Sequence, residues 1–298
     1  MDNQFVNDMK TMYCSRAFVI FSALISIEAL AQSKTYATID FGYGLNFGGT
    51  PIGYTRTSTA NASTYKVQEG SFGAGVNINA YLGHEFGPEG NLAGELGFSQ
   101  MMGAEKAFES TEISPFNAGS VTESELSKLT VSGFSLAFKM KTGTKADDIR
   151  LFVRPGIFVP IQSKFTKEEN ETVISFDPSV FTNYSYTKTE TRFAFALGYN
   201  LAIGVEWKAL EKIGVFAQLQ GLMLNLPTRR SEVIAYETKS GDNITRRIEN
   251  LSINERITEY SQEYTIDRII GSSEPKRESR YAVPASYIGL NVGFKLEF

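Results

Sequence analysis

The stretch FAFALGYNLAIGVEW, residues 193–207, decides the fold class of this chain. Every second residue from Phe193 to Trp207 is large and apolar, and the residues between them are small or polar, chiefly Ala, Gly and Asn. A period of two places alternate side chains on opposite faces of an extended strand. The stretch therefore predicts a β-strand with one continuous apolar face and one face of small residues.

Seven other segments show the same alternation and predict an all-β chain. Residues 129–132 break the phase of one segment and predict a bulge there. Pro155, Pro160 and Pro284 fall inside predicted strands, where each removes an amide from the hydrogen-bond ladder. The eight predicted strands cover residues 37–45, 71–83, 92–99, 133–140, 149–161, 193–207, 214–223 and 287–298.

The connections between these strands alternate between long and short. The long ones cover residues 48–70, 103–127, 162–190 and 226–280, and the short ones cover residues 84–91, 141–148 and 208–212. An even number of strands with short turns at one end is typical of a transmembrane β-barrel. The sequence thus predicts an eight-stranded antiparallel up-and-down transmembrane β-barrel with long extracellular loops and periplasmic termini.

The composition of the two strand faces separates this barrel from a soluble β-sandwich or a lipocalin-like barrel. A soluble sheet turns Lys, Glu and Thr to water, whereas here the polar face is mostly Gly, Ala, Ser and Asn, which suit a narrow lumen. The apolar face is long enough to cross the hydrocarbon layer. We expect Trp207 and Phe298 to form an aromatic girdle at the periplasmic end, and Phe72 and Phe193 at the outer end.

The first residues predict export. Lys10 and Arg16 precede an apolar run at 17–27, which ends in Ala29, Leu30 and Ala31. This pattern predicts a signal peptide over 1–31 and a barrel domain over 32–298. Removal of the signal peptide takes away the single cysteine. It also reduces the basic residues from 29 to 27 and the acidic residues from 33 to 30. The near balance of charge gives no reason to expect nucleic acid as a partner.

The C-terminal residues carry a resemblance to a known family. Asn291, Gly293, Leu296 and Phe298 resemble the terminal sorting signal that the outer-membrane barrel assembly machinery reads. In layout the whole predicted domain is similar to the OmpA/OmpX-type small outer-membrane β-barrel family, in versions common in Bacteroidetes-type bacteria. The resemblance implies a location in the bacterial outer membrane, contact with its lipid and lipopolysaccharide, and the assembly machinery as a partner during biogenesis.

Eight charged residues alternate toward the predicted lumen, four of each sign. Because an unpaired charge in a confined interior is costly, we expect them to form a salt-bridged network that blocks the lumen. A channel lining is the alternative interpretation. The eight residues are Asp40, Glu95, Lys139, Arg150, Arg154, Glu206, Lys295 and Glu297.

Catalysis and metal binding find little support in the sequence. Acyl transfer commonly needs a nucleophile beside a base, and the only histidine is His84, which we expect to be an ordinary residue beside a short periplasmic turn. Glu168, Glu169 and Glu171 form an acidic group that is open to calcium but more typical of a solvated loop. We expect no cofactor and no catalytic centre.

The long connections are the expected place of function, because binding residues commonly lie on loops carried by a rigid scaffold. Residues 226–280 hold ten basic and ten acidic residues, and residues 240–243 predict a hairpin tip. We expect the seventh and eighth strands to continue there as a polar ribbon; a ten-stranded barrel is the alternative.

The expected function is a non-enzymatic structural, adhesion or surface-binding role of a monomer. The alternatives are a small-solute pore, a membrane anchor within a secretion or surface-assembly machine, and a lipid-modifying enzyme.

Overall fold

The computed structural model describes residues 35–48, 50–58, 62–86, 89–114, 119–144, 147–175, 182–263 and 273–298. The predicted signal peptide lies outside these residues. In this part of the chain, no helix combines the length and hydropathy needed to cross a membrane.

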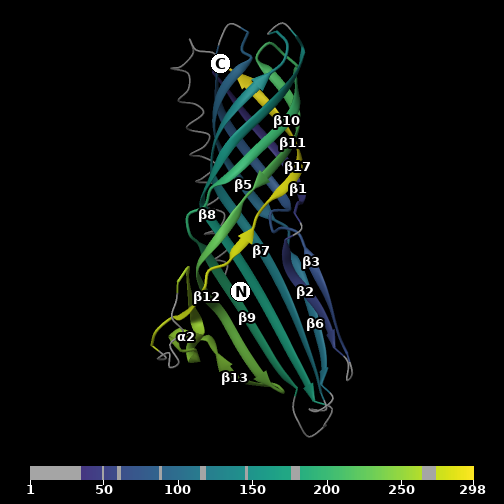
Figure 1. Ribbon diagram of the computed structural model, residues 1–298, viewed down its shortest axis with the longest axis vertical. Coiled ribbons are helices and arrows are strands. Elements are labelled where there is room, and N and C mark those ends of the chain that lie inside the picture. The colour runs from purple at the N-terminus through teal and green to yellow at the C-terminus, as the bar shows by residue number, and fades with distance from the viewer. Residues whose placement is uncertain are drawn as a thin grey trace.

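Eight antiparallel strands close into a barrel (Figure 1). Neighbours around the ring are hydrogen-bonded, and the ring closes where β1 pairs with β17 from Tyr36 opposite Glu297 to Asn46 opposite Tyr287. This confirms the predicted fold class. The strands are β1 (Thr35–Asn46), β4 (Gly75–Phe86), β5 (Leu92–Gly103), β7 (Gly119–Lys141), β8 (Ile149–Ser175), β10 (Gly198–Lys208), β11 (Ile213–Met223) and β17 (Tyr287–Glu297).

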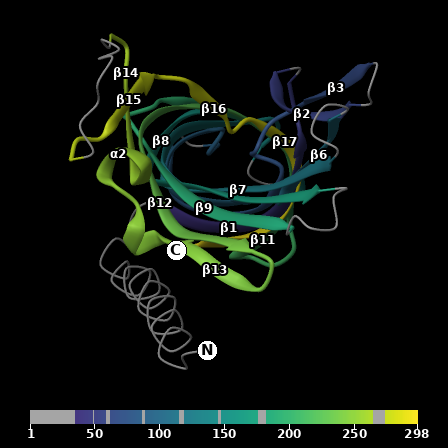
Figure 2. The same ribbon diagram turned by 90° about the horizontal axis from the view of Figure 1, so that it is seen from below.

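The long connections form strands of their own, which extend the barrel wall at one end (Figure 1). β7 and β8 run 23 and 27 residues, so both continue from the barrel into this extension. Seen along the barrel, β2, β3 and β6 lie on one side of the mouth, and α2, β14 and β15 on the other (Figure 2). The additional elements are β2 (Pro51–Ser58), β3 (Ser63–Glu69), β6 (Lys106–Ser114), β9 (Asn183–Phe193), β12 (Asn225–Ser240), β13 (Asn243–Arg247), η2 (Ile248–Asn250), α2 (Ile253–Arg256), β14 (Ile257–Ser261), β15 (Lys276–Ser279) and β16 (Ala282–Pro284).

The last long connection contains the predicted hairpin, but its strands pair differently from the prediction. A hairpin does turn at residues 240–243, where Ser240 pairs with Asn243 and Gly241 has a φ of 59°. The expected ribbon of strands seven and eight is wrong in its pairing, however. β12 pairs along its length with β9, which extends strand six, and only three of its residues pair with β16. β12 and β13 lie outside the closed ring, so the ten-stranded alternative is not realised.

The outward face of the barrel carries a belt of large apolar side chains. Phe195 is 77% exposed and Leu290 is 72% exposed. The belt continues around the ring through residues of all eight strands, which include Phe41, Val76, Leu96, Leu136, Leu151, Ile203, Leu219 and Phe294. In the sixth predicted strand, every second residue from Phe195 to Trp207 faces outward.

The expected outer girdle is wrong at both of its residues. Phe72 is buried and packs edge-on against Phe165 with 4.9 Å between ring centroids, and Phe193 is half-buried against the same apolar cluster. For Phe72 the cause is local: β4 begins only at Gly75, whose φ of 144° favours glycine, and residues 72–73 before it form a turn that points inward. A side chain at Gly75 would also lie 2.2 Å from the carbonyl oxygen of Met102.

The irregular positions are partly as predicted. The β7–β8 register shifts between Ser132 and Gly133, beside the predicted bulge, and the extra residue is Ile161 on β8. Pro155 lies within β8 opposite Leu201, and Pro160 lies opposite Gly133 beside the shift. Pro284 ends β16, a three-residue strand, where a missing amide removes little of the ladder.

Candidate functional site

The lumen holds a charged cluster near the end of the barrel that carries the short turns. Glu206 lies 2.7 Å from Lys139, 3.1 Å from Lys295 and 3.5 Å from Lys141, measured between carboxylate oxygens and Nζ atoms. Glu85 lies 2.7 Å from Lys141 and 3.0 Å from Lys295. All five side chains are nearly inaccessible to solvent. Each lysine thus has a carboxylate partner at hydrogen-bonding distance, which offsets the cost of burying the charges.

Two members of this cluster, Glu85 and Lys141, were not among the eight predicted lumen charges. Glu85 is two residues after Gly83, and Lys141 is two residues after Lys139. Because every second residue of these strands faces the lumen, the same alternation places both side chains inside. The sequence analysis places both residues in predicted turns, at 84–91 and 141–148. Both strands continue farther than that, to Phe86 and Lys141.

A second cluster lies deeper in the lumen around Arg154. Its guanidinium is 3.5 Å from Glu95 and 3.9 Å from Asp40, and it donates a hydrogen bond of 3.0 Å to Gln218. It also stacks over the ring of Tyr81 at 4.0 Å. All of these side chains are buried. One arginine therefore bridges two carboxylates from different strands across the lumen.

Tyr36 joins the two clusters. Its hydroxyl donates a 2.6 Å hydrogen bond to Glu95, and its ring faces the Nζ atoms of Lys295, Lys141 and Lys139 at 4.5, 5.3 and 5.7 Å from the centroid. Ammonium groups at such distances from a ring face are attracted by its quadrupole. No charge pattern marks this residue in the sequence, because a tyrosine on the inward face of a strand is not distinctive.

Two of the predicted lumen charges behave differently from the rest. Arg150 makes no ion pair with any described residue; its guanidinium donates to Asn91 Oδ1 and to the carbonyls of Gly90 and Thr142. It ties turn segments together rather than joining the carboxylate network. Glu297 is 2.5 Å from Lys295, but its side chain is 36% exposed at the rim of the lumen.

Amide side chains fill the middle of the lumen. Asn291 donates to Asp40 at 2.6 Å, to Asn77 at 2.7 Å and to Gln220 at 2.9 Å, so it links β17 to three other strands. Asn79 donates to Asp40 at 2.6 Å from the neighbouring position. The cavity beside them measures about 10 Å³. That volume is roughly what one water molecule needs.

An apolar plug closes the lumen toward the extension. Segments between the strands fold inward, and their backbones are tied together, since Phe72 N donates to Pro284 O at 2.9 Å and Ala285 N to Leu224 O at 2.8 Å. Glycine is needed at 73, where a side chain would lie 2.3 Å from Ala285 O. The plug comprises Phe72, Met101, Phe108, Leu129, Val131, Phe158, Phe165, Ala196, Leu222, Leu224, Leu226, Val283, Ala285 and Tyr287.

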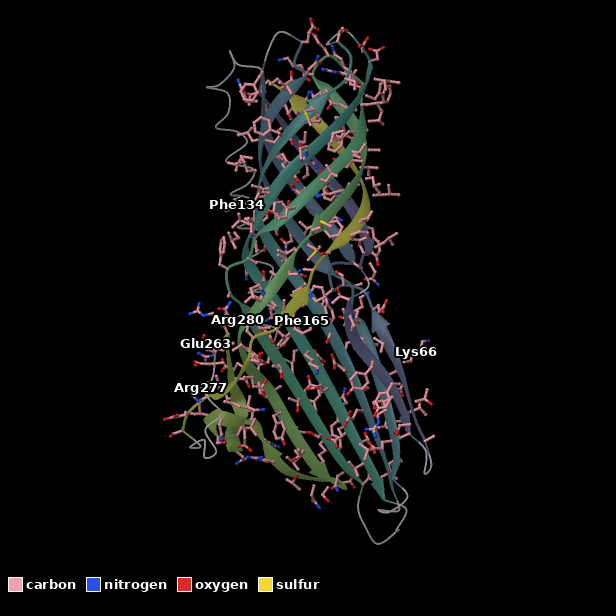
Figure 3. All side chains as sticks on the ribbon, viewed as in Figure 1. Lys66, Phe134, Phe165, Glu263, Arg277 and Arg280 are labelled. Atoms are coloured by element: carbon pink, nitrogen blue, oxygen red, sulfur yellow. The ribbon has the colours of Figure 1, made fainter. Side chains whose placement is uncertain are left out.

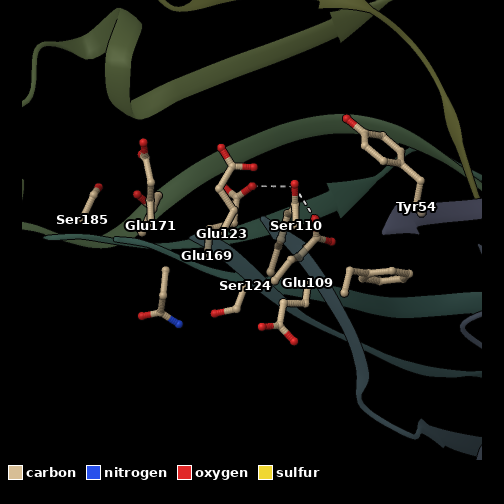
Figure 4. Close-up of a pocket in the computed structure, with 14 residues that line it drawn as sticks. Tyr54, Glu109, Ser110, Glu123, Ser124, Glu169, Glu171 and Ser185 are labelled. Atoms are coloured by element: carbon tan, nitrogen blue, oxygen red, sulfur yellow. Dashed lines mark ion pairs between the residues drawn. The ribbon is translucent and has the colours of Figure 1, made fainter. Parts of the chain in front are cut away.

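Beyond the plug, the inner face of the extension forms a trough of about 410 Å³ (Figure 4). Glu123 lies opposite Glu171 in the β7–β8 ladder, and Glu125 lies opposite Glu169. Lys167 contacts Glu169 at 2.7 Å and Glu125 at 3.0 Å. Burial acts to lower the pKa of Lys167, but these two carboxylates raise it above its usual value. Lys167 therefore remains charged and offsets part of the repulsion between like charges.

The acidic group considered for calcium does not converge. Glu169 faces the trough with Lys167, whereas Glu168 is paired with Lys188 at 2.7 Å. Glu171 lines the same trough as Glu169 and lies opposite Glu123 in the β7–β8 ladder, so Glu168 is the one on the other face of β8. Over the described ranges, no group of three or more acidic or histidine side chains is arranged to hold a metal ion.

His84 lies near the end of β4 on the exposed face. Its Nδ1 is 3.4 Å from the hydroxyl of Thr35, and its ring packs edge-on against Phe86 with 5.3 Å between centroids. The location beside a short turn agrees with the sequence expectation.

The four C-terminal residues of the predicted sorting signal divide into two pairs. Asn291 and Gly293 belong to the lumen, where a side chain at Gly293 would lie 2.6 Å from the ring of Phe216. Leu296 is exposed on the outer face, and Phe298 N donates to Thr35 O at 3.0 Å.

Comparison with known proteins finds matches among solved structures. No protein-family model matches the sequence, and no curated protein matches it. Among solved structures, the crystal structure of Neisserial surface protein A is similar with a TM-score of 0.32 and 7% sequence identity, over 89% of this chain and 97% of that one.

Proposed function

We propose that the chain is a non-enzymatic outer-membrane protein whose barrel is a closed anchor and whose extracellular sheet carries a structural or adhesive role. The observation that carries the proposal is the continuous apolar belt around a closed ring. A sheet whose outer face is in hydrocarbon must close on itself, because lipid offers no partner for edge amides. The resemblance of its C-terminal residues to the sorting signal supports the same location.

The filled lumen favours an anchor over a small-solute pore. The buried charge clusters, the amide layer with its cavity of about 10 Å³ and the apolar plug lie in series along the barrel. Planar-bilayer recording of the purified protein should show no large, stable conductance. Regular openings in the wild type, lost when the lumen is mutated, would support the pore instead.

The extension is the proposed functional surface because its β-ladders hold it in a defined shape. Proteolysis of intact cells with mass spectrometry should give cleavage within residues 226–280 and leave residues 142–148 intact. Cleavage at 142–148 with protection of 226–280 would reverse the proposed orientation.

The nature of the partner separates adhesion from a role within a surface-assembly machine. Mild crosslinking on cells, followed by purification, should recover no stoichiometric envelope protein if the sheet is adhesive. A variant lacking β13, residues 243–247, should then lose surface binding while its barrel still inserts. A constant envelope partner would favour the machine.

A further inference from the structure

Five arginines gather around an open cavity of about 1000 Å³ on one flank of the extension. Arg280 and Arg277 lie on the same flank, whereas Lys66 lies on the opposite one (Figure 3). The arginines come from separate elements of the extension: Arg192 on β9, Arg229 and Arg230 on β12, Arg277 on β15, and Arg280 directly after β15.

A β-bulge concentrates three of these arginines. Thr228 pairs with Phe193 and Arg230 pairs with Arg192, so Arg229 is an extra residue between two ladder positions. Such a bulge bends the strand and redirects a side chain. The backbone thereby brings Arg192, Arg229 and Arg230 to one edge of the cavity.

The opposite edge is fixed by contacts around Tyr281. Thr228 N donates to Tyr281 O at 2.8 Å, and Tyr281 N donates back to the Thr228 hydroxyl at 3.2 Å. The ring of Tyr281 packs edge-on against Tyr260 at 5.4 Å, and Arg280 donates to Tyr260 O at 3.4 Å. These contacts hold the segment that carries Arg280 against β12.

Three of the five arginines at this cavity have no partner among the described residues. Arg192, Arg229 and Arg277 make no side-chain hydrogen bond or ion pair with any described residue, and the buried Nε of Arg280 has no acceptor. Arg230 has a contact of 3.6 Å with Glu232. Glu259 and Glu263 also line the cavity, so five cations face two carboxylates. The excess of charge selects for an anion.

The cavity adjoins the apolar belt. Phe193 lines it, and two residues farther along the chain is Phe195, the most exposed of the large apolar side chains on the described surface. A ligand here meets guanidinium groups on one side and the start of the hydrocarbon-facing surface on the other. That combination matches a lipid whose phosphate lies next to its acyl chains.

We propose that the arginine cavity binds the phosphate groups of an outer-leaflet lipid, that is, a phosphorylated glycolipid such as lipopolysaccharide. Planar guanidinium groups match phosphate oxygens and form paired, charge-assisted hydrogen bonds. The inference rests on the proposed membrane location, because such a lipid is present only there. Binding of one lipid would fix the extension relative to the membrane surface.

The test compares retention of labelled lipopolysaccharide by the immobilised full chain in detergent micelles. The triple variant R192Q/R229Q/R277Q should bind at least tenfold more weakly than the wild type, because each arginine near a headgroup contributes to affinity. Enzymatic removal of the lipid phosphates should weaken wild-type binding by a similar factor. The control variant K66Q/R247Q/K212Q removes the same charge elsewhere and should bind like the wild type. Far-UV circular dichroism checks that both variants fold.

Three outcomes would overturn the proposal: equal losses in the two triple variants, undiminished binding of dephosphorylated lipid, or displacement of the lipid by an equal concentration of inorganic phosphate. The last would indicate a site for a free anion. Failure of the wild type to insert into vesicles would instead contradict the proposed membrane location. Insertion without phosphate-dependent retention would contradict the arginine site alone.

Discussion

The substitution Glu206→Gln tests whether the lumen clusters stabilise the barrel. The carboxylate of Glu206 lies within 3.5 Å of Lys139, Lys141 and Lys295. Glutamine keeps the volume but removes the charge, which leaves three buried ammonium groups with Glu85 and the half-exposed Glu297 as their remaining acidic partners.

Breaking a buried ion pair by removing one partner typically costs about 3–5 kcal/mol. We therefore expect E206Q to lower the free energy of unfolding by about that amount. Urea unfolding in lipid vesicles measures it through the fluorescence of Trp207, the only tryptophan, which faces outward on β10. The double variant K139M/E206Q should recover at least half of the loss, because the second change removes one of the uncompensated charges.

The exposed Glu211, in the turn between β10 and β11, provides the matched control. E211Q should change stability by less than about 0.5 kcal/mol, as is usual for a surface substitution. A loss below about 1 kcal/mol in E206Q would refute the reasoning, because it would mean that the lumen solvates an unpaired lysine.

Three other predictions concern the plug, the glycine at the start of β4 and the extension. Phe72→Ala should lower the free energy of unfolding by about 3–5 kcal/mol in the same assay, since it leaves a cavity in the plug; wild-type stability would show that the plug does not contribute. Gly75→Ala should prevent folding or shift the unfolding midpoint strongly, whereas Gly221→Ala, where a side chain has 3.9 Å of space, should be tolerated; equal midpoints would contradict the role of the positive φ. Hydrogen bonds from the Ser252 side chain and backbone lower the pKa of Glu255 to about 2. At pH values above the unfolded pKa of about 4.3, the charged carboxylate therefore stabilises the start of α2. This stabilisation is lost as the pH falls toward 2. In Ser252→Ala, which keeps the backbone donor, an NMR titration should find that the pKa of Glu255 is higher; an unchanged value would exclude the hydroxyl of Ser252 as the main cause.

The sequence alone predicts which side chains lie on the outer face of the barrel. Alternation along one strand fixes which side chains share a face, and the belt from Phe195 to Trp207 follows it residue by residue. The inward positions of Lys139 and Arg154 follow from the same period. Their partners cannot be read from it, because contacts across a lumen join strands far apart in the chain.

The sequence does not predict the plug, and of the extension it predicts only a polar ribbon with a hairpin at 240–243, whose strand pairing is wrong. In the sequence Phe72 continues the apolar alternation of β4, but in the structure β4 begins at Gly75 and Phe72 lies in an inward turn before it. The strands of the extension have polar residues on both faces, so they give no amphipathic signal and read as loops. The bulge at Arg229 depends on the register between β9 and β12, which the residues of either strand alone do not determine.

The length of β7 and β8 has a mechanical consequence. Their ladder runs without a change of partner from Gly119 opposite Ser175 to Lys141 opposite Phe152. At about 3.3 Å per residue, the 27 residues of β8 reach roughly 90 Å, far more than a bilayer requires. A pull on the tip acts along these strands and loads their hydrogen bonds in shear, all at once. A force on the tip is thereby passed along one continuous pair of strands into the wall of the barrel.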